Sequence, residues 1–255
     1  MDRSSSPNAA QLLAQALTRD SARPFVTYYD DSSGERVELS TASFANWVAK
    51  TANLIVDGLG REPGDVVGID LPRHWIAGVW ALAAWSAGLR VLVPDRATGS
   101  PAEHVDVAVR AHPVPMADGA EADDLVIVSL LPLGAPPPFG SLPAGATDYA
   151  REVPGYGDRF VPSAGAGPSL LLHGATELEQ DAASLARELA ADWELGAGGR
   201  LLVAKPLDPV AELIAASMVP LVVGGSVVLC AHPDDSMISG RAEAERVSAS
   251  AGSRP

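Results

Sequence analysis

Residues 66–93 decide the fold: they read Val-Val-Gly-Ile-Asp-Leu at 66–71, Trp-Ile-Ala-Gly-Val-Trp-Ala-Leu-Ala-Ala-Trp-Ser-Ala at 75–87, and Val-Leu-Val at 91–93. The first run predicts a continuous apolar strand, and the second predicts a helix that is apolar nearly all round. Gly88 ends this helix. A strand, a helix and a second strand in this order form a βαβ unit, whose strands are parallel and covered by helices on both faces. The stretch therefore predicts an α/β protein.

Upstream of this unit, the pattern predicts a helix, a hairpin and a second helix. The first helix covers 8–19. Two β-rich runs, 25–29 and 36–39, flank a turn-forming Asp-Asp-Ser-Ser-Gly segment, as in a β-hairpin. Apolar residues at helical spacing then predict a helix that starts near Thr41 and ends at the glycines of 58–60.

The rest of the chain predicts further strands and a second unit of the same kind. Strands are expected at 105–109 and 125–130. Thr176, with Glu179 three residues later, forms a capping box that would start the first helix of the second unit. That second βαβαβ unit is expected to have strands at 169–172, 200–204 and 226–230 and a further helix over 210–220.

These elements suggest four parts of the chain. Residues 1–131 form a first α/β subdomain, and 132–168 form a Pro- and Gly-rich connector. Residues 169–238 form the second βαβαβ subdomain, and 239–255 are expected to be a frayed helix followed by disorder. The predicted fold is two βαβ-type units with mostly parallel sheets covered by helices.

Composition excludes several classes of protein. The chain of 255 residues has 18 Lys and Arg against 32 Asp and Glu, a net charge of −14. Its only lysines are Lys50 and Lys205, so a nucleic-acid partner or an anionic membrane surface is not expected. Cys230 is the only cysteine, which excludes an intrachain disulfide and favours a cytoplasmic location. It ends an apolar strand and is expected to be buried. No run approaches the roughly 18 apolar residues of a membrane span.

Five segments resemble a known superfamily. They lie at 36–44, 58–72, 81–95, 198–207 and 220–229, and include Gly-Leu-Gly-Arg-Glu-Pro-Gly-Asp-Val-Val-Gly-Ile-Asp-Leu-Pro. They resemble the N-terminal part of the acyl-adenylate-forming enzymes, which comprise acyl-CoA synthetases, adenylation domains and luciferases. Residues 142–152 are similar to an actinobacterial family of short proteins related to AMP-binding enzymes. The resemblance covers nearly the whole chain, but its best parts are scaffold motifs.

The catalytic motifs that this resemblance implies are mostly missing. In the superfamily, a Ser/Thr/Gly-rich loop ending in Pro-Lys follows a strand and cradles the triphosphate. Here strand 169–172 is expected to run straight into the helix capped by Thr176, with no residues left for a loop. Glu177 and Glu179 would also repel phosphate. The segment 163–167 has a suitable composition, but it precedes the strand and lacks Pro-Lys.

Further family positions also depart from the pattern. Residues 207–209 read Leu-Asp-Pro where the family has an aromatic residue and often a histidine. The family's adenine and magnesium loop, ribose-binding aspartate and C-terminal lysine lie further downstream, and a chain ending at Pro255 lacks them. Without these groups, the in-line displacement at the α-phosphate is not stabilised.

Weak candidates for a binding site lie at the ends of two strands. Arg73 and His74 follow the strand at 66–71, and His173 and Gly174 follow the strand at 169–172, where α/β proteins place ligands. The alternative is a solvated helix start at His74 and a strand end without a catalytic partner at His173. Tryptophans 47, 75, 80 and 85 are expected in the core.

No metal site is expected. His104, His112 and His232 lack the pairwise spacing of metal ligands. Asp234 and Asp235 after the last strand are expected to form a solvated turn.

Together these features predict a catalytically degenerate relative of AMP-dependent ligases that acts as a binding or scaffold protein, with no catalytic residues and no cofactor. The alternative is half of a split ligase that a partner chain completes. Only that alternative, an AMP-forming acid ligase, would use ATP or AMP with magnesium. A protein partner is possible under either hypothesis.

Overall fold

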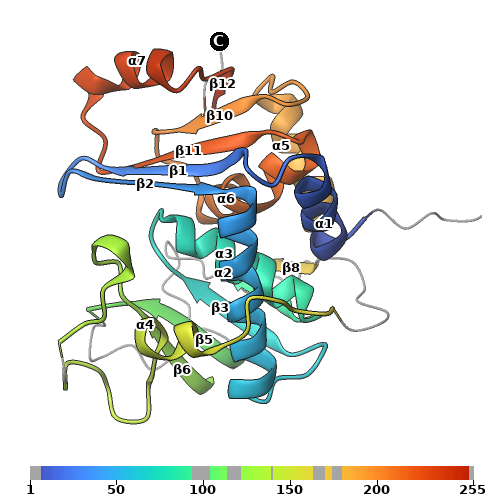
Figure 1. Cartoon of the computed structure of the whole chain (residues 1–255), viewed down its shortest axis with the longest axis vertical. Helices are drawn as coiled ribbons and strands as arrows, with labels where there is room; N and C mark the ends of the chain where they lie inside the picture. Colours follow the sequence, from blue (N-terminus) through green and yellow to red (C-terminus); the bar gives the residue numbers. More distant parts are fainter. Residues whose placement is uncertain are drawn as a thin grey trace, which may run out of the picture.

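The computed structural model describes residues 7–93, 104–113, 122–138, 140–162, 170–173 and 180–252. Its strands form two sheets, of five and seven strands, in which nearly all neighbouring strands are parallel. Figure 1 shows the two sheets as separate layers with helices between them. The predicted α/β fold with mostly parallel, helix-covered sheets is therefore confirmed.

The five-stranded sheet combines both ends of the chain. Its β1–β2 pair is the predicted antiparallel hairpin, and β1 pairs in parallel with β11. In spatial order the strands are β12 (Ala249–Ser250), β10 (Arg200–Val203), β11 (Ser226–Ala231), β1 (Pro24–Asp30) and β2 (Glu35–Ser40).

The seven-stranded sheet is built around the predicted βαβ unit of residues 66–93. Its strands β3 and β4 are parallel neighbours, with Val66 opposite Arg90 and Gly68 opposite Leu92. The spatial order is β7 (Thr147–Asp148), β6 (Ala122–Val128), β5 (Val105–Ala111), β3 (Val66–Asp70), β4 (Arg90–Val93), β8 (Leu170–His173) and β9 (Gln180–Asp181). The β8–β9 pair is antiparallel.

The helices fill the space between the sheets and cover their outer faces. Every residue of α3 is buried, which explains why its sequence is apolar on all sides. Helix α7 lies on the outer face of the five-stranded sheet (Figure 1). The α-helices are α1 (Ala9–Arg19), α2 (Thr41–Asn53), α3 (Trp75–Ser86), α4 (Tyr149–Glu152), α5 (Ala182–Asp192), α6 (Pro209–Val223) and α7 (Asp235–Ala244). Among the described residues, none of these helices has the length and apolar character needed to cross a membrane.

Three short turns of other helix types complete the described structure. A π-helical turn, η1 (Leu54–Gly58), continues α2, and two 3-10 turns, η2 (Pro132–Gly134) and η3 (Val153–Gly155), lie in the expected connector. The core predictions hold, because Trp75, Trp80 and Trp85 are buried and Trp47 packs against the core from a half-buried position. Cys230 is buried as predicted.

The sheets do not divide the chain at the expected boundaries. The hairpin of 24–40 joins strands from the last quarter of the chain, whereas β8 and β9 join the sheet formed by residues 66–148. Residues 1–131 and 169–238 are thus interleaved and do not form two consecutive units. Apolar runs identify strands, but they do not specify which strand lies beside which.

The connector and the tail are more regular than expected. Within 132–168, β7 extends the seven-stranded sheet and Tyr149 of α4 is buried, where its hydroxyl is 2.7 Å from that of Thr51. Within 239–252, the helix expected at the start of the tail is the end of α7, which continues to Ala244. The disorder expected after it is wrong for the described residues, because β12 pairs with β10. This segment packs on the five-stranded sheet through few apolar side chains, among them Ala242 and Val247. So few apolar residues do not form a pattern from which the packing could be predicted.

Candidate functional site

A pocket lies where α3 and α6 begin, at the carboxyl ends of β3 and β4. Parallel strands end at the same edge of a sheet, and α/β proteins bind ligands there. The pocket encloses about 470 Å³, counting its open mouth. It is lined by Ile69, Asp70, Leu71, Pro72, Arg73, His74, Ala77, Val93, Pro209, Glu212, Leu213 and Ala216. The predicted candidates Arg73 and His74 are therefore both part of its wall.

Arg73 connects the two sheets. It follows β3 of the seven-stranded sheet, yet its guanidinium donates to the carbonyl oxygens of Cys230 at 2.9 Å and Ala204 at 3.1 Å, at the ends of β11 and β10. It also donates to the Lys205 carbonyl at 2.8 Å and pairs with Glu212 of α6. Four protein acceptors thus hold this side chain, which makes Arg73 chiefly a structural clamp.

His74 is a buried helix cap and not the solvated helix start of the alternative interpretation. Its side chain is 3% exposed, and its Nδ1 accepts the Ile76 N–H at 3.2 Å at the start of α3. The ring packs on Tyr28, with centroids 4.5 Å apart. Burial lowers the pKa of His74 to about 4, although the nearby Asp30 carboxylate acts in the opposite direction. The imidazole is therefore neutral at pH 7, with its proton on Nε2.

The second pair of candidates lies farther along the same edge. His173 ends β8, and its backbone is opposite Val93 of β4, a residue that lines the pocket. The side chain of His173 and all of Gly174 lie outside the described residues. The structure therefore brings Arg73 and His74 together and leaves His173 two strands away from them.

The first helix described after β8 is α5. Helix α5 begins at Ala182 and is capped by Asp181, whose carboxylate accepts the Ser184 N–H at 2.7 Å. Thr176 and Glu179, the predicted capping box, lie outside the described residues. Residues 174–179, on which the expected direct passage from strand to helix depends, also lie outside the described residues, and the described chain resumes with β9 before α5. The sequence pattern did not predict Asp181 as the helix cap, because Thr176 and Glu179 form the pattern of a capping box five residues earlier.

The segment 207–209 is used to start α6. Asp208 accepts the Ala211 N–H at 3.0 Å, and Pro209 occupies the first turn and lines the pocket. These residues stand where the resemblance implies an aromatic residue and a histidine.

Asp234 caps α7 by accepting the Ser236 N–H, so the expected solvated turn at 234–235 is a helix start.

A group of possible metal ligands also comes together. His104, Asp106 and Asp123 place one ligand atom each within 4.8 Å of the others. His232 instead lies by Asp30, with Nδ1 3.0 Å from the carboxylate. The spacing between histidines does not reveal this group, because two of its three members are aspartates. A His-x-Asp pair on one strand beside an Asp on the next was the signal available in the sequence.

Comparison with known proteins places this geometry in context. No protein-family model matches the chain. A TIGR03089 family protein of Mycobacterium tuberculosis is 34% identical over 236 residues, covering 92% of this chain and 94% of that protein.

Solved structures share the fold. A Brucella canis acyl-CoA synthetase matches with a TM-score of 0.75 at 17% identity. The match covers 94% of this chain and 46% of the synthetase. A fatty acyl CoA synthetase of M. tuberculosis has a TM-score of 0.67 at 15% identity, and the match covers 94% of this chain and 48% of the synthetase. The inhibitor-bound N-terminal domain of FACL13 from M. tuberculosis has a TM-score of 0.67 at 14% identity, and the match covers 95% of this chain and 62% of that domain.

This chain spans about half the length of the two whole synthetases. At these identities the likeness establishes the fold alone. The fold is that of the N-terminal part of acyl-CoA synthetases, and the chain belongs to the TIGR03089 family.

Proposed function

We propose that the chain is a binding protein that uses the N-terminal fold of acyl-CoA synthetases without adenylating a carboxylate itself. One observation carries this proposal. Residues 174–181, which join β8 to α5 where the resemblance implies the phosphate loop, contain Glu177, Glu179 and Asp181 and no Lys or Arg. A triphosphate needs cations and free N–H groups at such a position.

The start of α5 supports the same conclusion. The Asp181 carboxylate already accepts one of the N–H groups that would attract an anion there. Its negative charge also offsets the positive end of the helix dipole. The start of α5 would therefore repel the phosphates of a nucleoside triphosphate, whereas an uncapped helix start would attract them.

The pocket supports a small and largely apolar ligand. Its wall contains Ile69, Leu71 and Val93, and the neutral His74 adds a single ring. The guanidinium of Arg73 is held by protein acceptors, but its Nε is buried and has no hydrogen-bond partner among the described residues. Because this Nε is closed off from the pocket, the wall offers a ligand chiefly apolar contacts, as for the alkyl part of a short acyl group.

Calorimetric titration with three probes tests the proposal. Mg-ATP is expected to give no heat, and acid-dependent ATP–pyrophosphate exchange is expected to be absent. Octanoate or a non-hydrolysable acyl-adenylate analogue is expected to bind at micromolar strength, about −8 kcal/mol. Ala77→Leu, which adds volume to the pocket wall, should abolish this binding, whereas Gly240→Ala on exposed α7 should not.

Two outcomes contradict the proposal. Micromolar binding of Mg-ATP together with pyrophosphate exchange would show that the chain retains adenylation. Folded protein that binds neither octanoate nor the analogue would show that the pocket is not a binding site.

The second candidate function is half of a split acid ligase. The coverage of 46% and 48% of two acyl-CoA synthetases motivates it, since under this hypothesis a separate chain supplies the half of such an enzyme that the match does not cover. The test is isolation of the protein from native lysate by size. A stoichiometric partner that restores ATP–pyrophosphate exchange would support this candidate, and a monodisperse monomer without exchange would contradict it.

A further inference from the structure

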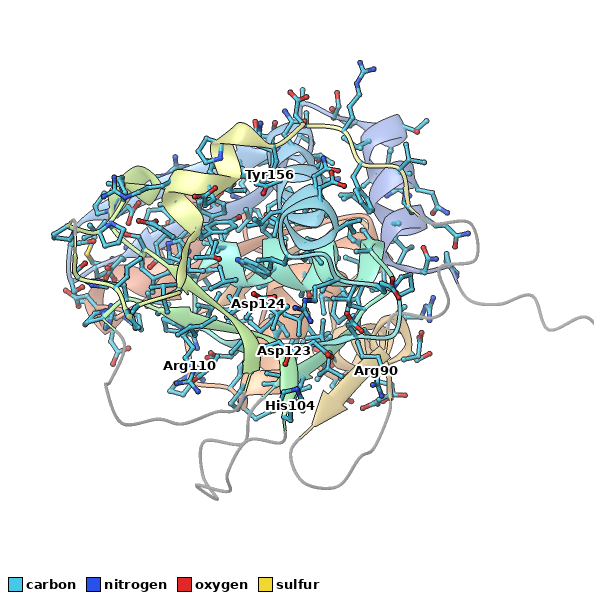
Figure 2. All side chains as sticks on the ribbon, turned by 90° about the horizontal axis from the view of Figure 1, so that it is seen from below. Arg90, His104, Arg110, Asp123, Asp124 and Tyr156 are labelled. Carbon is cyan, nitrogen blue, oxygen red and sulfur yellow. The ribbon has the colours of Figure 1, made fainter. Side chains whose placement is uncertain are left out.

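Three side chains of metal-binding type gather at the amino ends of β5 and β6. One ligand atom each from His104, Asp106 and Asp123 lies within 4.8 Å of the others. Figure 2 shows His104 and Asp123 at the same end of these strands, with Asp124 nearby. This edge of the seven-stranded sheet is opposite the pocket, which lies at the carboxyl ends of the strands.

The strands themselves bring these residues together. His104 directly precedes β5 and Asp106 is the second residue of that strand, a spacing of two that places both side chains on the same face. In the parallel register, Val105 is opposite Ala122 and Val107 is opposite Asp124, which places Asp123 beside Asp106. Donors fixed by neighbouring strands keep their positions better than donors on loops.

The separation of two of these ligand atoms matches the spacing around a metal ion. His104 Nε2 lies 3.4 Å from Asp123 Oδ1. Tetrahedral coordination with bonds of about 2.1 Å separates two ligand atoms by about 3.4 Å. A zinc-sized ion therefore fits between these two atoms without separating the strands.

Each carboxylate retains coordinating capacity. Asp106 accepts the Val66 N–H through Oδ2 at 2.7 Å, and Asp123 accepts Arg61 Nη1 through Oδ2 at 3.2 Å. An ionised carboxylate has about four lone-pair sites, so one contact leaves the second oxygen available.

The local charge favours a cation. Arg61 pairs with Asp123 and with Asp124. Three aspartates against one arginine leave an excess of two negative charges when His104 is neutral. A divalent ion would balance this excess.

We propose that His104, Asp106 and Asp123 bind a divalent transition-metal ion of the zinc class. One imidazole and two carboxylates are the N and O donors that Zn²⁺ and Co²⁺ accept, and the absence of sulfur in the set disfavours Cu(I). Water fills the remaining positions, because His104 and Asp123 are exposed. The ion joins β5 to β6 and stabilises the fold by mass action. This site is separate from the proposed ligand pocket.

The test uses the full chain after chelator treatment, titrated with ZnCl₂ by calorimetry and with CoCl₂ by visible absorption. Binding of one ion at micromolar strength is expected, with a rise in Tm. His104→Ala and Asp123→Asn should each weaken binding at least tenfold. His232→Ala is the matched control, since this exposed histidine lies by Asp30 and away from the cluster, and it should leave the affinity unchanged.

Arg61→Gln provides a second, opposite signature. Removal of the cation that competes for Asp123 should tighten Zn²⁺ binding severalfold. This gain should disappear when His104→Ala is added, whereas general adsorption to an acidic surface would keep it. The proposal is wrong if the folded chain binds neither ion at millimolar concentration. It is also wrong if His104→Ala binds both ions as tightly as the unmodified protein.

Discussion

Gly78 of α3 lies directly against the backbone of Ala216 of α6, so that a Cβ atom at residue 78 would be 2.5 Å from the Ala216 carbonyl oxygen. These two helices lie between the sheets, and their first turns line the pocket. The absence of a side chain at residue 78 therefore sets how closely the helices approach and, with that, the width of the pocket.

The substitution Gly78→Ala is expected to destabilise the protein. The new methyl group must displace backbone in a closely packed core, at a cost of about 1–3 kcal/mol. Urea unfolding measures this as a lower midpoint with an unchanged slope.

The matched control is Gly240→Ala in α7. Residue 240 is exposed, and a Cβ atom there would meet nothing within 4 Å. This change should stabilise the helix by up to about 1 kcal/mol. Equal stability of Gly78→Ala and the unmodified protein would contradict the close crossing of α3 and α6.

Buried His74 should make stability depend on pH between about 6.5 and 4. Its pKa in the fold is about 4, below the ordinary value of 6.5, so the unfolded chain binds more protons in this window. Stability is thus fully present above pH 6.5 and declines as the pH falls. From these two pKa values, the loss between pH 7 and pH 5 is about 2 kcal/mol.

His74→Asn is the variant that isolates this effect. Asparagine is a good helix cap and can accept the Ile76 N–H, but it does not titrate. The free energy of unfolding, measured in urea at pH 7 and pH 5, should therefore fall less in the variant. The same pH dependence in both proteins would show that His74 is protonated normally in the fold.

Asp31 should hold α7 on the five-stranded sheet. Its carboxylate makes a two-pronged contact with Arg241, at 2.6 and 3.2 Å, and accepts the Asp234 N–H at 2.7 Å. The Asp31 and Arg241 side chains are only 10% and 6% exposed. Asp31→Ala leaves the Arg241 charge buried without this partner and should cost about 3 kcal/mol.

Hydrogen exchange of residues 235–252 measures the docking of α7 directly. Faster exchange in Asp31→Ala is expected, and Asp235→Asn, a change at an exposed first-turn residue, should leave exchange unchanged. The hydrogen bond from Arg241 lowers the pKa of Asp31. This stabilisation is therefore present above the ordinary aspartate pKa of 3.8 and is lost as the pH falls below it. Unchanged exchange in Asp31→Ala would show that α7 docks by its apolar contacts alone.

The sequence predicts those parts of the fold in which one long pattern determines the structure. Residues 75–87 are apolar on every side, and α3 is accordingly buried on every side. The sequence does not predict the partner of β8, because Leu170–His173 is a short apolar run that fits beside any parallel strand. Its pairing with β4 is decided by the three-dimensional arrangement of the layers.

The candidate site shows the same limit. The position of Arg73 and His74 follows from the end of β3, so it could be predicted. The Arg73 guanidinium binds carbonyls at the ends of β10 and β11, which lie 131 to 157 residues further along the chain in the second sheet. No local pattern encodes this contact. His104, Asp106 and Asp123 were missed for a similar reason, since the pairing of β5 with β6 brings them together.

The clamp formed by Arg73 should contribute strongly to stability. Arg73→Met keeps much of the volume but leaves the carbonyl of Cys230 and the Glu212 carboxylate without their partner, at a cost of about 2–4 kcal/mol. Glu212→Gln removes one charge and keeps a hydrogen-bond acceptor, so it should cost about 1 kcal/mol.

The double variant distinguishes a direct pair from two independent effects. Arg73→Met removes the charge that Glu212 neutralises, so adding Glu212→Gln to it should cost less than Glu212→Gln alone. We expect a coupling of about 1 kcal/mol in urea unfolding. Costs that add to within about 0.3 kcal/mol would mean that Arg73 stabilises the fold through the backbone carbonyls alone. Coupling of the expected size would instead show that the junction of the two sheets depends on the charge pair, and that a ligand drawing Arg73 away from Glu212 would loosen it.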